Sequence, residues 1–133
     1  MKKRGILNPG LARIVAGMGH GDMLMVCDCG LPIPHGKPVA DILLTFGIPP
    51  FADTLKVILE ELRVERAIIA REMTKVNAPV FNQVKTLLEG IPIKKVSHEN
   101  LKEISRTAGN ISFVRTGEAT RYANVILVAG VEF

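Results

Sequence analysis

A histidine framed by glycines, followed by an apolar run and an aspartate, is the segment of this sequence best suited to chemistry. His20 lies between Gly19 and Gly21, residues 23–27 are apolar, and Asp28 opens a stretch rich in glycine and proline. Imidazole titrates near neutral pH, so a histidine can both accept and donate a proton. Strand ends and the loops after them are where α/β proteins place their chemistry. The segment therefore indicates proton transfer that needs no cofactor.

The spacing argues against His20 and Asp28 acting as a pair within one chain. A strand rises ~3.3 Å per residue, so a strand over residues 23–27 sets the two side chains far apart. We therefore expect a site that a neighbouring chain completes. Each residue also has a structural explanation, with His20 as a cation at a helix C-terminus and Asp28 as a turn former.

Two further segments carry hydrogen-bonding side chains. We expect Ser97 to begin a helix as its N-cap, which puts His98 in the first turn and Lys102 on the same face. Residues 115–124 contain guanidinium, carboxylate, phenol and amide groups, a mixture that suits a polyhydroxylated ligand. The alternatives are surface positions for His98 and Lys102, and turn formation with one salt bridge for 115–124.

Two other patterns could indicate a metal site or a phosphate-binding loop, but each departs from the usual motif. The possible metal ligands are Cys27, Cys29, His35 and His20. A Cys-x-Cys pair lacks the usual zinc spacing, and burial as small apolar side chains explains the cysteines more simply. The glycines around Met18 resemble a phosphate loop, but they follow a predicted helix, whereas a dinucleotide fingerprint follows a strand. We therefore predict no metal and no other cofactor.

Length, composition and charge limit the class of protein. The chain has 133 residues, of which 47% are hydrophobic, so we expect one domain over 1–133 with its sheet covered on both faces and some apolar surface buried against other subunits. The net charge of +4 is spread along the chain, whereas nucleic-acid binding needs a concentrated stripe. No apolar run approaches a membrane span or a signal peptide, so we expect a cytoplasmic protein with no membrane partner.

Hydrophobic periodicity predicts helices that alternate with strands. We expect helices from Asn8-Pro9 to Gly19, from Asp53 or Thr54, from Asn77 to Gly90 and from Ser97, and strands over 23–27, 40–46, 64–70, 91–96, 111–115 and 125–131. This order indicates an α/β fold with a largely parallel or mixed sheet. The last two strands have no helix between them, so they can pair antiparallel and make the sheet mixed.

Taken together, these segments resemble the ribose pyranase/fucose mutarotase family nearly from end to end. The matching motifs are Gly5-Ile6-Leu7-Asn8, Gly19-His20 with Asp22 and Asp28, Gly30-Leu31-Pro32-Ile33-Pro34, Gly47-Ile48-Pro49 with Phe51, Ser97-His98-Glu99 with Lys102, Arg115-Thr116-Gly117-Glu118, Tyr122-Ala123-Asn124 and Ala129-Gly130-Val131. The chain length and the Tyr-Ala-Asn motif are similar to the ribose branch. Arg121 departs from that branch, which usually carries proline before the tyrosine.

The resemblance implies a three-layer α/β/α sandwich with a mixed, largely parallel central sheet. It implies a homo-oligomer, a decamer of two pentameric rings, with sites formed between subunits. His20 would be the catalytic acid/base, and D-ribose would be bound, without a metal or other cofactor, by Asp28, His98, Lys102, Tyr122, Ala123 and Asn124. The implied activity interconverts β-pyranose and β-furanose D-ribose as part of ribose catabolism. A fucose-type mutarotase and a non-catalytic sugar-binding module are the alternatives.

Overall fold

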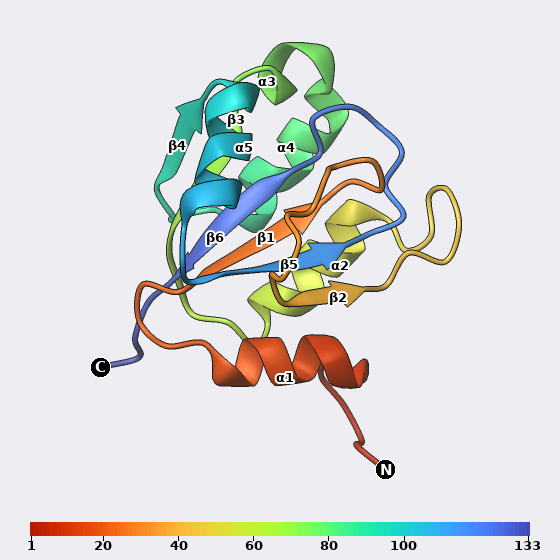
Figure 1. Ribbon diagram of the computed structural model, residues 1–133, viewed down its shortest axis with the longest axis vertical. Helices are drawn as coiled ribbons and strands as arrows, with labels where there is room; N and C mark the ends of the chain where they lie inside the picture. The colour runs from red at the N-terminus through yellow and green to blue at the C-terminus, as the bar shows by residue number, and fades with distance from the viewer.

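The chain folds around a six-stranded sheet with the strand order β2-β5-β1-β6-β3-β4 (Figure 1). The computed structural model describes residues 1–133. The strands are β1 (Met23–Cys27), β2 (Val39–Asp41), β3 (Val64–Ala70), β4 (Ile93–Val96), β5 (Ile111–Arg115) and β6 (Val125–Ala129). The helices are α1 (Pro9–Gly17), α2 (Phe51–Leu59), α3 (Met73–Val76), α4 (Ala78–Leu87) and α5 (His98–Thr107). None of the helices has the length and hydropathy that crossing a membrane requires.

The sheet is mixed because β6 runs against the other strands. It pairs antiparallel with β1 and β3, whereas β1 with β5, β2 with β5 and β3 with β4 are parallel pairs. A mixed, largely parallel sheet is therefore confirmed. The expectation that the last two strands pair with each other is wrong, because β1 lies between β5 and β6. The connection over 116–124 must consequently pass over the end of β1, which is where Asp28 lies.

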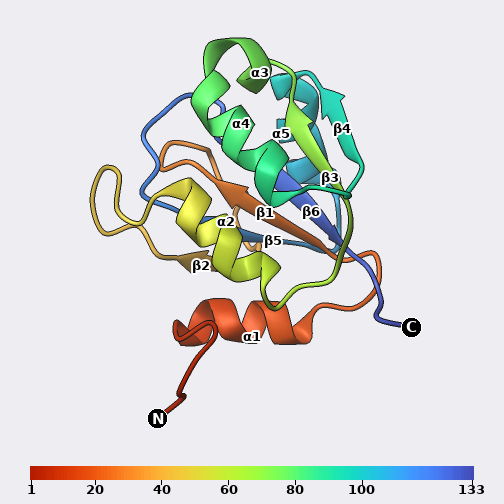
Figure 2. The same ribbon diagram turned by 180° about the vertical axis from the view of Figure 1, so that it is seen from behind.

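Helices cover both faces of the sheet (Figures 1 and 2). On one face α1, α2 and α4 pack against a buried cluster that includes Leu24 and Val26 of β1. On the other face α5 packs against a second cluster that includes Met25 and Cys27 of the same strand. Successive side chains of a strand point to opposite faces, so one apolar strand supplies both cores. The predicted three-layer sandwich is confirmed.

Two predicted helix starts are confirmed by their caps. The side-chain oxygen of Asn8 accepts a hydrogen bond from the backbone N–H of Leu11 at 3.0 Å, at the start of α1. The hydroxyl oxygen of Ser97 accepts one from the backbone N–H of Asn100 at 3.1 Å, at the start of α5. Such caps satisfy backbone donors that have no partner within the helix. The cap at Ser97 fixes where His98 begins its helix.

The start of α2 differs from its prediction. The helix begins at Phe51 after Pro50, which makes no side-chain cap, and not after Asp53 or Thr54. The hydroxyl of Thr54 instead donates to the carbonyl of Pro50 at 3.0 Å, so Thr54 already lies within the first turn. A proline at the preceding position therefore outweighs the better capping residues that follow it.

The second strand is shorter than predicted. β2 ends at Asp41, although the apolar run continues to Phe46. Residues 42–48 form a protruding turn closed by a bridge between Thr45 and Ile48, and we call this segment the apolar turn. β2 is an edge strand that pairs only with β5, so no second neighbour extends it. Ile42 packs against the core, whereas Leu43, Leu44, Phe46 and Ile48 are exposed.

Candidate functional site

A cavity of about 470 Å³ lies where β1 ends, between the connection 116–124 and the first turn of α5. It is lined by Asp28, Cys29, Gly30, Leu31, Pro32, His98, Lys102, Glu118, Ala119, Thr120, Arg121 and Tyr122. The fold therefore brings Asp28, His98, Lys102 and Tyr122 together from segments that are far apart in the sequence. We call it the β1-end cavity.

Asp28 and Asn124 hold each other by two hydrogen bonds. The side-chain amide of Asn124 donates to Oδ2 of Asp28 at 2.8 Å, and its oxygen accepts from the backbone N–H of Asp28 at 3.0 Å. The other carboxylate oxygen of Asp28 accepts from the backbone N–H of Gly30 at 3.0 Å. A carboxylate offers about four acceptor positions, so Asp28 can still accept from ligand hydroxyls.

Ala123 and Asn124, both predicted to bind the sugar, are fully buried and do not line the cavity. The side chain of Ala123 lies in the core beneath α1, α2 and α4. Ala123 therefore supports the wall of the cavity from the core and presents no side chain to it. Asn124 reaches the cavity through its bonds to Asp28.

The start of the connection 116–124 is held by hydrogen bonds to the end of β1. The hydroxyl and the backbone N–H of Thr116 both donate to the carbonyl of Cys27, at 2.8 and 3.0 Å. The backbone N–H of Cys29 donates to the carbonyl of Glu118 at 2.9 Å. These bonds continue the pairing of β1 beyond its last residue, so the connection forms a fixed wall of the cavity.

Asn77 holds the middle of the same connection, a role that the sequence did not reveal. Its side-chain amide donates to the hydroxyl of Thr120 at 2.7 Å and to the carbonyl of Arg121 at 2.9 Å. α4 begins after Asn77 as predicted, but the side chain does not cap the helix. In the sequence, Asn77 two residues before Pro79 is fully accounted for as the start of a helix. The neighbouring residues give no sign that its side chain bonds to residues more than forty positions away.

Tyr122 and His98 form an aromatic pair at the cavity wall. Tyr122 is the one residue other than glycine with a positive φ, 61°, a conformation that bulky side chains rarely adopt. Its ring meets the His98 ring edge to face, with the ring centroids 5.0 Å apart. Unusual backbone conformations persist where the surroundings fix them, and they gather at functional sites. The pairing gives the phenol a defined direction.

His98 is also fixed through its backbone. Its N–H donates to both carboxylate oxygens of Glu72, at 3.1 and 3.0 Å, and this bond lowers the pKa of Glu72. The Nδ1 atom of His98 is buried and makes no hydrogen bond within the chain. A buried polar atom without a partner at a cavity wall is a candidate contact for a ligand hydroxyl. Sequence reasoning missed Glu72, which directly precedes α3, a short helix that was not predicted.

Lys102 carries the positive charge of the cavity. Its ammonium lies 2.7 Å from a carboxylate oxygen of Glu99, one turn earlier on α5. The hydrogen bond from Lys102 lowers the pKa of Glu99. The Lys102 side chain is 25% exposed and that of Glu99 74%, so the lysine lies on the inner side of the pair. Lys102 can therefore donate to a ligand that enters the cavity.

His20 lies at the opposite end of β1. The backbone N–H of the next residue, Gly21, donates to the carbonyl of Ala129 at 2.9 Å, which places His20 beside the end of β6. The side chain is 60% exposed, and its Nε2 lies 2.9 Å from a carboxylate oxygen of Glu65. A five-residue strand is about 16 Å long, so within one chain His20 cannot reach the β1-end cavity.

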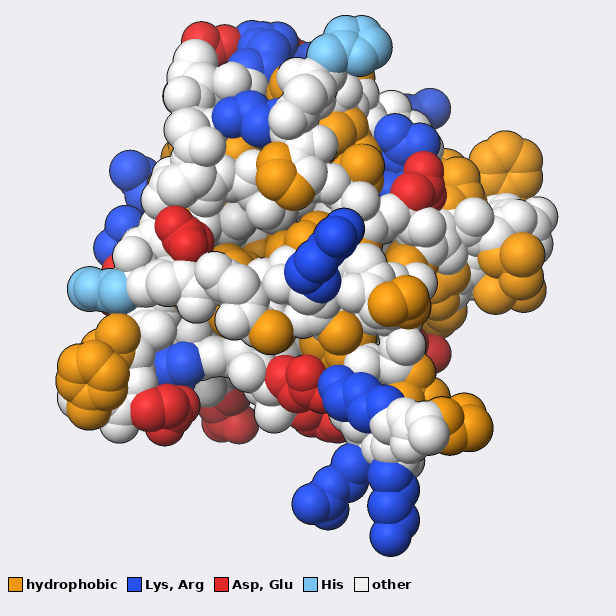
Figure 3. Space-filling model, turned by 60° about the horizontal axis from the view of Figure 1, so that its bottom comes forward, with side chains coloured by type: hydrophobic (Ala, Val, Ile, Leu, Met, Phe, Trp, Pro, Cys, Tyr) orange, Lys and Arg blue, Asp and Glu red, His pale blue; other side chains and the backbone are white.

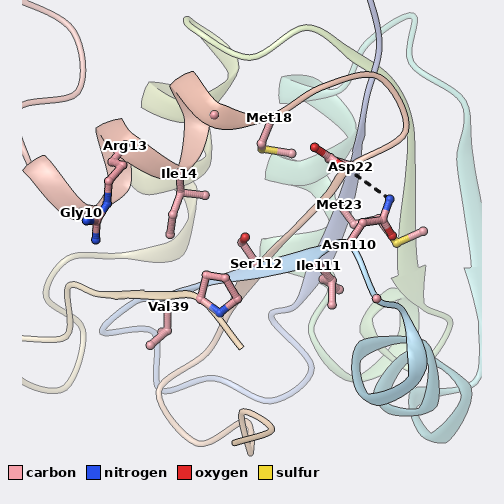
Figure 4. Close-up of a pocket in the computed structure, with 13 residues that line it drawn as sticks. Gly10, Arg13, Ile14, Met18, Asp22, Met23, Val39, Asn110, Ile111 and Ser112 are labelled. Atoms are coloured by element: carbon pink, nitrogen blue, oxygen red, sulfur yellow. Dashed lines mark hydrogen bonds between the residues drawn. The ribbon is translucent and has the colours of Figure 1, made fainter. Parts of the chain in front are cut away.

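A second cavity, of about 440 Å³, lies between α1 and the first residues of β1 and β5 (Figure 4). Arg13, Asp22, Asn110 and Ser112 supply its polar side chains. The carboxylate of Asp22 already accepts from the backbone N–H of Gly19 at 2.8 Å and from the amide of Asn110 at 3.4 Å. None of the predicted sugar-binding residues lines this cavity. We call it the reference cavity, because a substitution in it serves as a control for substitutions in the β1-end cavity.

The cysteines occupy different surroundings. Cys27 is buried, and burial raises the pKa of its thiol to about 12. Cys29 is partly exposed and lines the β1-end cavity. No three His, Cys, Asp or Glu side chains are placed where they could hold a metal ion together. The four possible metal ligands in the sequence are therefore not gathered into one site.

Comparison of the sequence with known proteins finds one family over nearly the whole chain. The model of the RbsD / FucU transport protein family matches residues 1–132. A D-ribose pyranase from Symbiobacterium thermophilum is 53% identical over 133 residues, covering 100% of both chains. A D-ribose pyranase from Laribacter hongkongensis is 46% identical over the same length and coverage.

Solved structures share the fold. Bacillus subtilis RbsD in complex with D-ribose matches with a TM-score of 0.93 and 42% identity, covering 100% of both chains. The fucose mutarotase from Streptococcus pneumoniae in complex with L-fucose matches with a TM-score of 0.81 and 23% identity, covering 99% of this chain and 100% of the other. At that lower identity the likeness establishes the fold alone.

Proposed function

Because this chain belongs to the RbsD/FucU transport protein family, we propose that it is an isomerase that interconverts the β-pyranose and β-furanose forms of D-ribose. D-ribose pyranases at 53% and 46% identity and the ribose-bound RbsD fold support this substrate. The observation that carries the proposal is the β1-end cavity, where a carboxylate, an ammonium, a phenol and an imidazole converge. Such a set can hold several hydroxyl groups in one orientation.

The reaction moves protons and transfers no electrons. When the pyranose opens, the anomeric hydroxyl loses its proton, the bond between the anomeric carbon and the ring oxygen breaks, and the ring oxygen gains a proton. The open aldehyde rotates, and another hydroxyl adds to the carbonyl carbon as it loses its proton and the carbonyl oxygen gains one. One group that takes a proton at one oxygen and returns it at another balances both steps, and such catalysis contributes ~10²–10⁴-fold.

In this proposal His20 is that acid/base group, and the other predicted residues bind the sugar. The Asp28 carboxylate accepts hydrogen bonds from sugar hydroxyls, and Lys102 and Tyr122 donate to them. Nδ1 of His98 offers a further contact, and Asn124 keeps Asp28 in place. Ala123 has no exposed surface in the single chain, so a sugar contact through its backbone would require the connection to shift on binding.

We further propose that His20 acts in the cavity of a neighbouring chain, within a decamer of two pentameric rings. The separation of His20 from Asp28 along β1 supports a shared site. The apolar turn supports self-association, because Leu44, Phe46 and Ile48 are 78%, 80% and 52% exposed. Hydrophobic side chains gather on this protrusion at the right-hand edge of Figure 3. Exposed apolar groups that cluster in this way are typical of protein interfaces.

A cytoplasmic location and a role in ribose catabolism belong to the same proposal. Furanose ribose is the form that a ribose kinase accepts. An isomerase that supplies it would therefore act between sugar import and phosphorylation.

Saturation-transfer NMR on D-ribose tests the activity, because it reports exchange between the pyranose and furanose anomeric signals. We expect exchange that depends on the protein, is lost in Asp28→Asn, persists in the reference-cavity variant Ser112→Ala and survives a metal chelator. Exchange of L-fucose but not of D-ribose would identify a fucose-type mutarotase instead. Binding of D-ribose without faster exchange would identify a non-catalytic sugar-binding module.

A further inference from the structure

We propose that Glu65 is a positioning residue for His20, and that it makes Nδ1 the imidazole atom that exchanges protons with the sugar. The inference rests on the proposed role of His20 as the acid/base and adds the group that orients it. It assigns a role to a glutamate that no sequence motif singled out.

The contact between the two side chains fixes which nitrogen carries the hydrogen. Nε2 of His20 lies 2.9 Å from Oε2 of Glu65. An ionised carboxylate only accepts hydrogen bonds, so Nε2 must be the donor. In neutral imidazole the other nitrogen then holds the free lone pair, and Nδ1 of His20 makes no hydrogen bond within the chain. Nδ1 is therefore the atom left to accept a proton.

Arg66 fixes the carboxylate in turn. Its guanidinium donates to Oε1 of Glu65 at 2.7 Å, so each carboxylate oxygen has its own partner. The order along the network is Arg66, Glu65 and His20, all on the surface at one end of the sheet. The same logic, a carboxylate that holds an imidazole in one tautomer, operates in Ser-His-Asp triads.

The backbone of β3 turns Glu65 toward His20. In the pairing of β3 with β6, Val64 lies opposite Ala129 and Arg66 opposite Val128, so Glu65 is an extra residue in a β-bulge. A bulge bends its strand and re-aims a side chain, and bulges are frequent next to active sites. The bulge therefore gives the position of Glu65 a structural cause.

Gly130 lets the chain pass close to this bulge. A Cβ atom at Gly130 would lie 3.2 Å from the Cβ of Glu65, a tight approach for a side chain. The preceding residue, Ala129, accepts the hydrogen bond from Gly21 that places the His20 loop beside the end of β6. The backbone thus brings the glutamate and the histidine together from segments 45 residues apart.

If Glu65 only stabilised the fold, its removal would lower the melting temperature; if it positions His20, its removal lowers kcat. The side chains of His20 and Glu65 are 60% and 33% exposed, and exposed ion pairs add little to stability. Removal of the carboxylate should therefore leave the melting temperature nearly unchanged and act on kcat. KM should change little, because Glu65 does not line the β1-end cavity.

The sharpest test is Glu65→Gln. The Arg66 guanidinium should donate to the single oxygen of the new amide, which leaves the amide NH₂ facing His20. Nε2 of His20 must then accept a hydrogen bond instead of donating one. The proton then sits on Nδ1, and kcat should fall ~10²-fold. Glu65→Ala should lose only ~10-fold, because it removes the support without imposing the wrong tautomer. The double variant Glu65→Gln/Arg66→Ala should regain part of the activity, because the amide is then free to turn over.

The imidazole ¹⁵N shifts of His20 give a readout independent of rate. We expect the hydrogen on Nε2 in the parent protein and on Nδ1 in Glu65→Gln. Glu132→Gln is the matched control, since it removes an exposed carboxylate that pairs with Arg63 and does not contact His20. If Glu65→Gln and Glu65→Ala keep the parent kcat and tautomer while His20→Ala is inactive, the inference is wrong and the proposed function stands. If His20→Ala exchanges the ribose forms at the parent rate, the proposed acid/base role of His20 is wrong and this inference falls with it. If Glu65→Gln does not fold, the kcat and tautomer of Glu65→Ala decide.

Discussion

The two ends of β1 are built in opposite ways. At the carboxyl end, Asp28 receives hydrogen bonds from Asn124 and Gly30, and its surroundings are locked by a connection that crosses the strand. At the amino end, His20 has one side-chain partner and is largely exposed. The proposed binding groups are thus organised within the chain, whereas the proposed acid/base group is presented outward.

The difference follows from the hydrogen-bonding groups that are buried at each end. A half-buried polar cluster is stable only if nearly every donor and acceptor is paired, so the cavity wall needs many internal bonds. An exposed side chain is paired by water and needs little support until another surface covers it. The contrast agrees with our proposal that a neighbouring chain completes the site.

Mixing two inactive variants is the strongest test of this contrast. His20→Ala should lose ~10²-fold or more in exchange rate while it folds normally, because it removes the acid/base group. Tyr122→Phe should also be impaired. If one chain supplies His20 and its neighbour supplies Tyr122, about a quarter of the sites in a random 1:1 mixture will carry both native residues. Saturation-transfer NMR after subunit exchange should then detect recovered activity.

Each variant taken through the same exchange protocol alone is the control for that experiment. No recovery after demonstrated mixing would place both residues in one chain's contribution to the site. Light scattering that finds a monomer at micromolar concentration would remove the shared site altogether.

Loosening the carboxyl end should affect binding and stability together. Asn77→Ala removes both side-chain bonds to the connection 116–124 and leaves the carbonyl of Arg121 without its donor. We expect a loss of about 1–3 kcal/mol in the free energy of unfolding, measured with urea, and a higher KM for D-ribose. Asn82→Ala on the exposed side of α4 is the control, and an equal rise in KM there would contradict the assigned role of Asn77.

The anchor beneath His98 should make stability depend on pH. The bond from the His98 N–H lowers the pKa of Glu72 from its usual 4.5, so the bond stabilises the fold above that pH and the stabilisation is lost as the pH falls through the lowered pKa. Urea unfolding should find Glu72→Gln less stable than the parent at neutral pH, with the difference shrinking in acid. A difference that stays constant to low pH would show that Glu72 acts by packing alone. Glu89→Gln, an exposed glutamate without a side-chain hydrogen bond, is the control.

The smallest effect concerns the two thiols at the carboxyl end. With the pKa of Cys27 raised to about 12, its reactive thiolate is scarce at neutral pH, whereas Cys29 is accessible in the cavity. Iodoacetamide should modify Cys29 alone, and D-ribose should slow the reaction. Mass spectrometry locates the label, and Cys29→Ser should take up none. Labelling of Cys27 at a comparable rate would mean that the end of β1 opens readily.

The sequence predicted the buried strands better than the edges of the sheet. The ranges 23–27, 64–70 and 111–115 match β1, β3 and β5, because most residues of these strands are apolar and buried in the interior of the sheet. The apolar run at 40–46 predicted a longer strand than β2, which ends at Asp41. β2 is an edge strand with one neighbour, so no second strand extends its pairing. The order of strands could not be read from local pattern, so the predicted pairing of β5 with β6 failed.

The candidate site divides in a similar way. Side chains proposed to meet the ligand carry recognisable chemistry, so the sequence alone could single out His20, Asp28, His98 and Tyr122 as candidates. Side chains that support the site act through partners distant in the chain, and the sequence around them does not set them apart from ordinary surface residues. The contacts of Glu65, Glu72 and Asn77 span 45, 26 and 43 residues. Only the folded chain could reveal them.

The central place of β6 also governs how the chain can be made. β6 is the last strand to leave the ribosome, yet it joins β2-β5-β1 to β3-β4, and all five of its residues are buried. Until it arrives, β1 and β3 each present an open apolar edge, which is a template for pairing with other chains. Truncation before Val125 would therefore yield fragments prone to aggregation, and the sheet can be completed only after β6 has been synthesised.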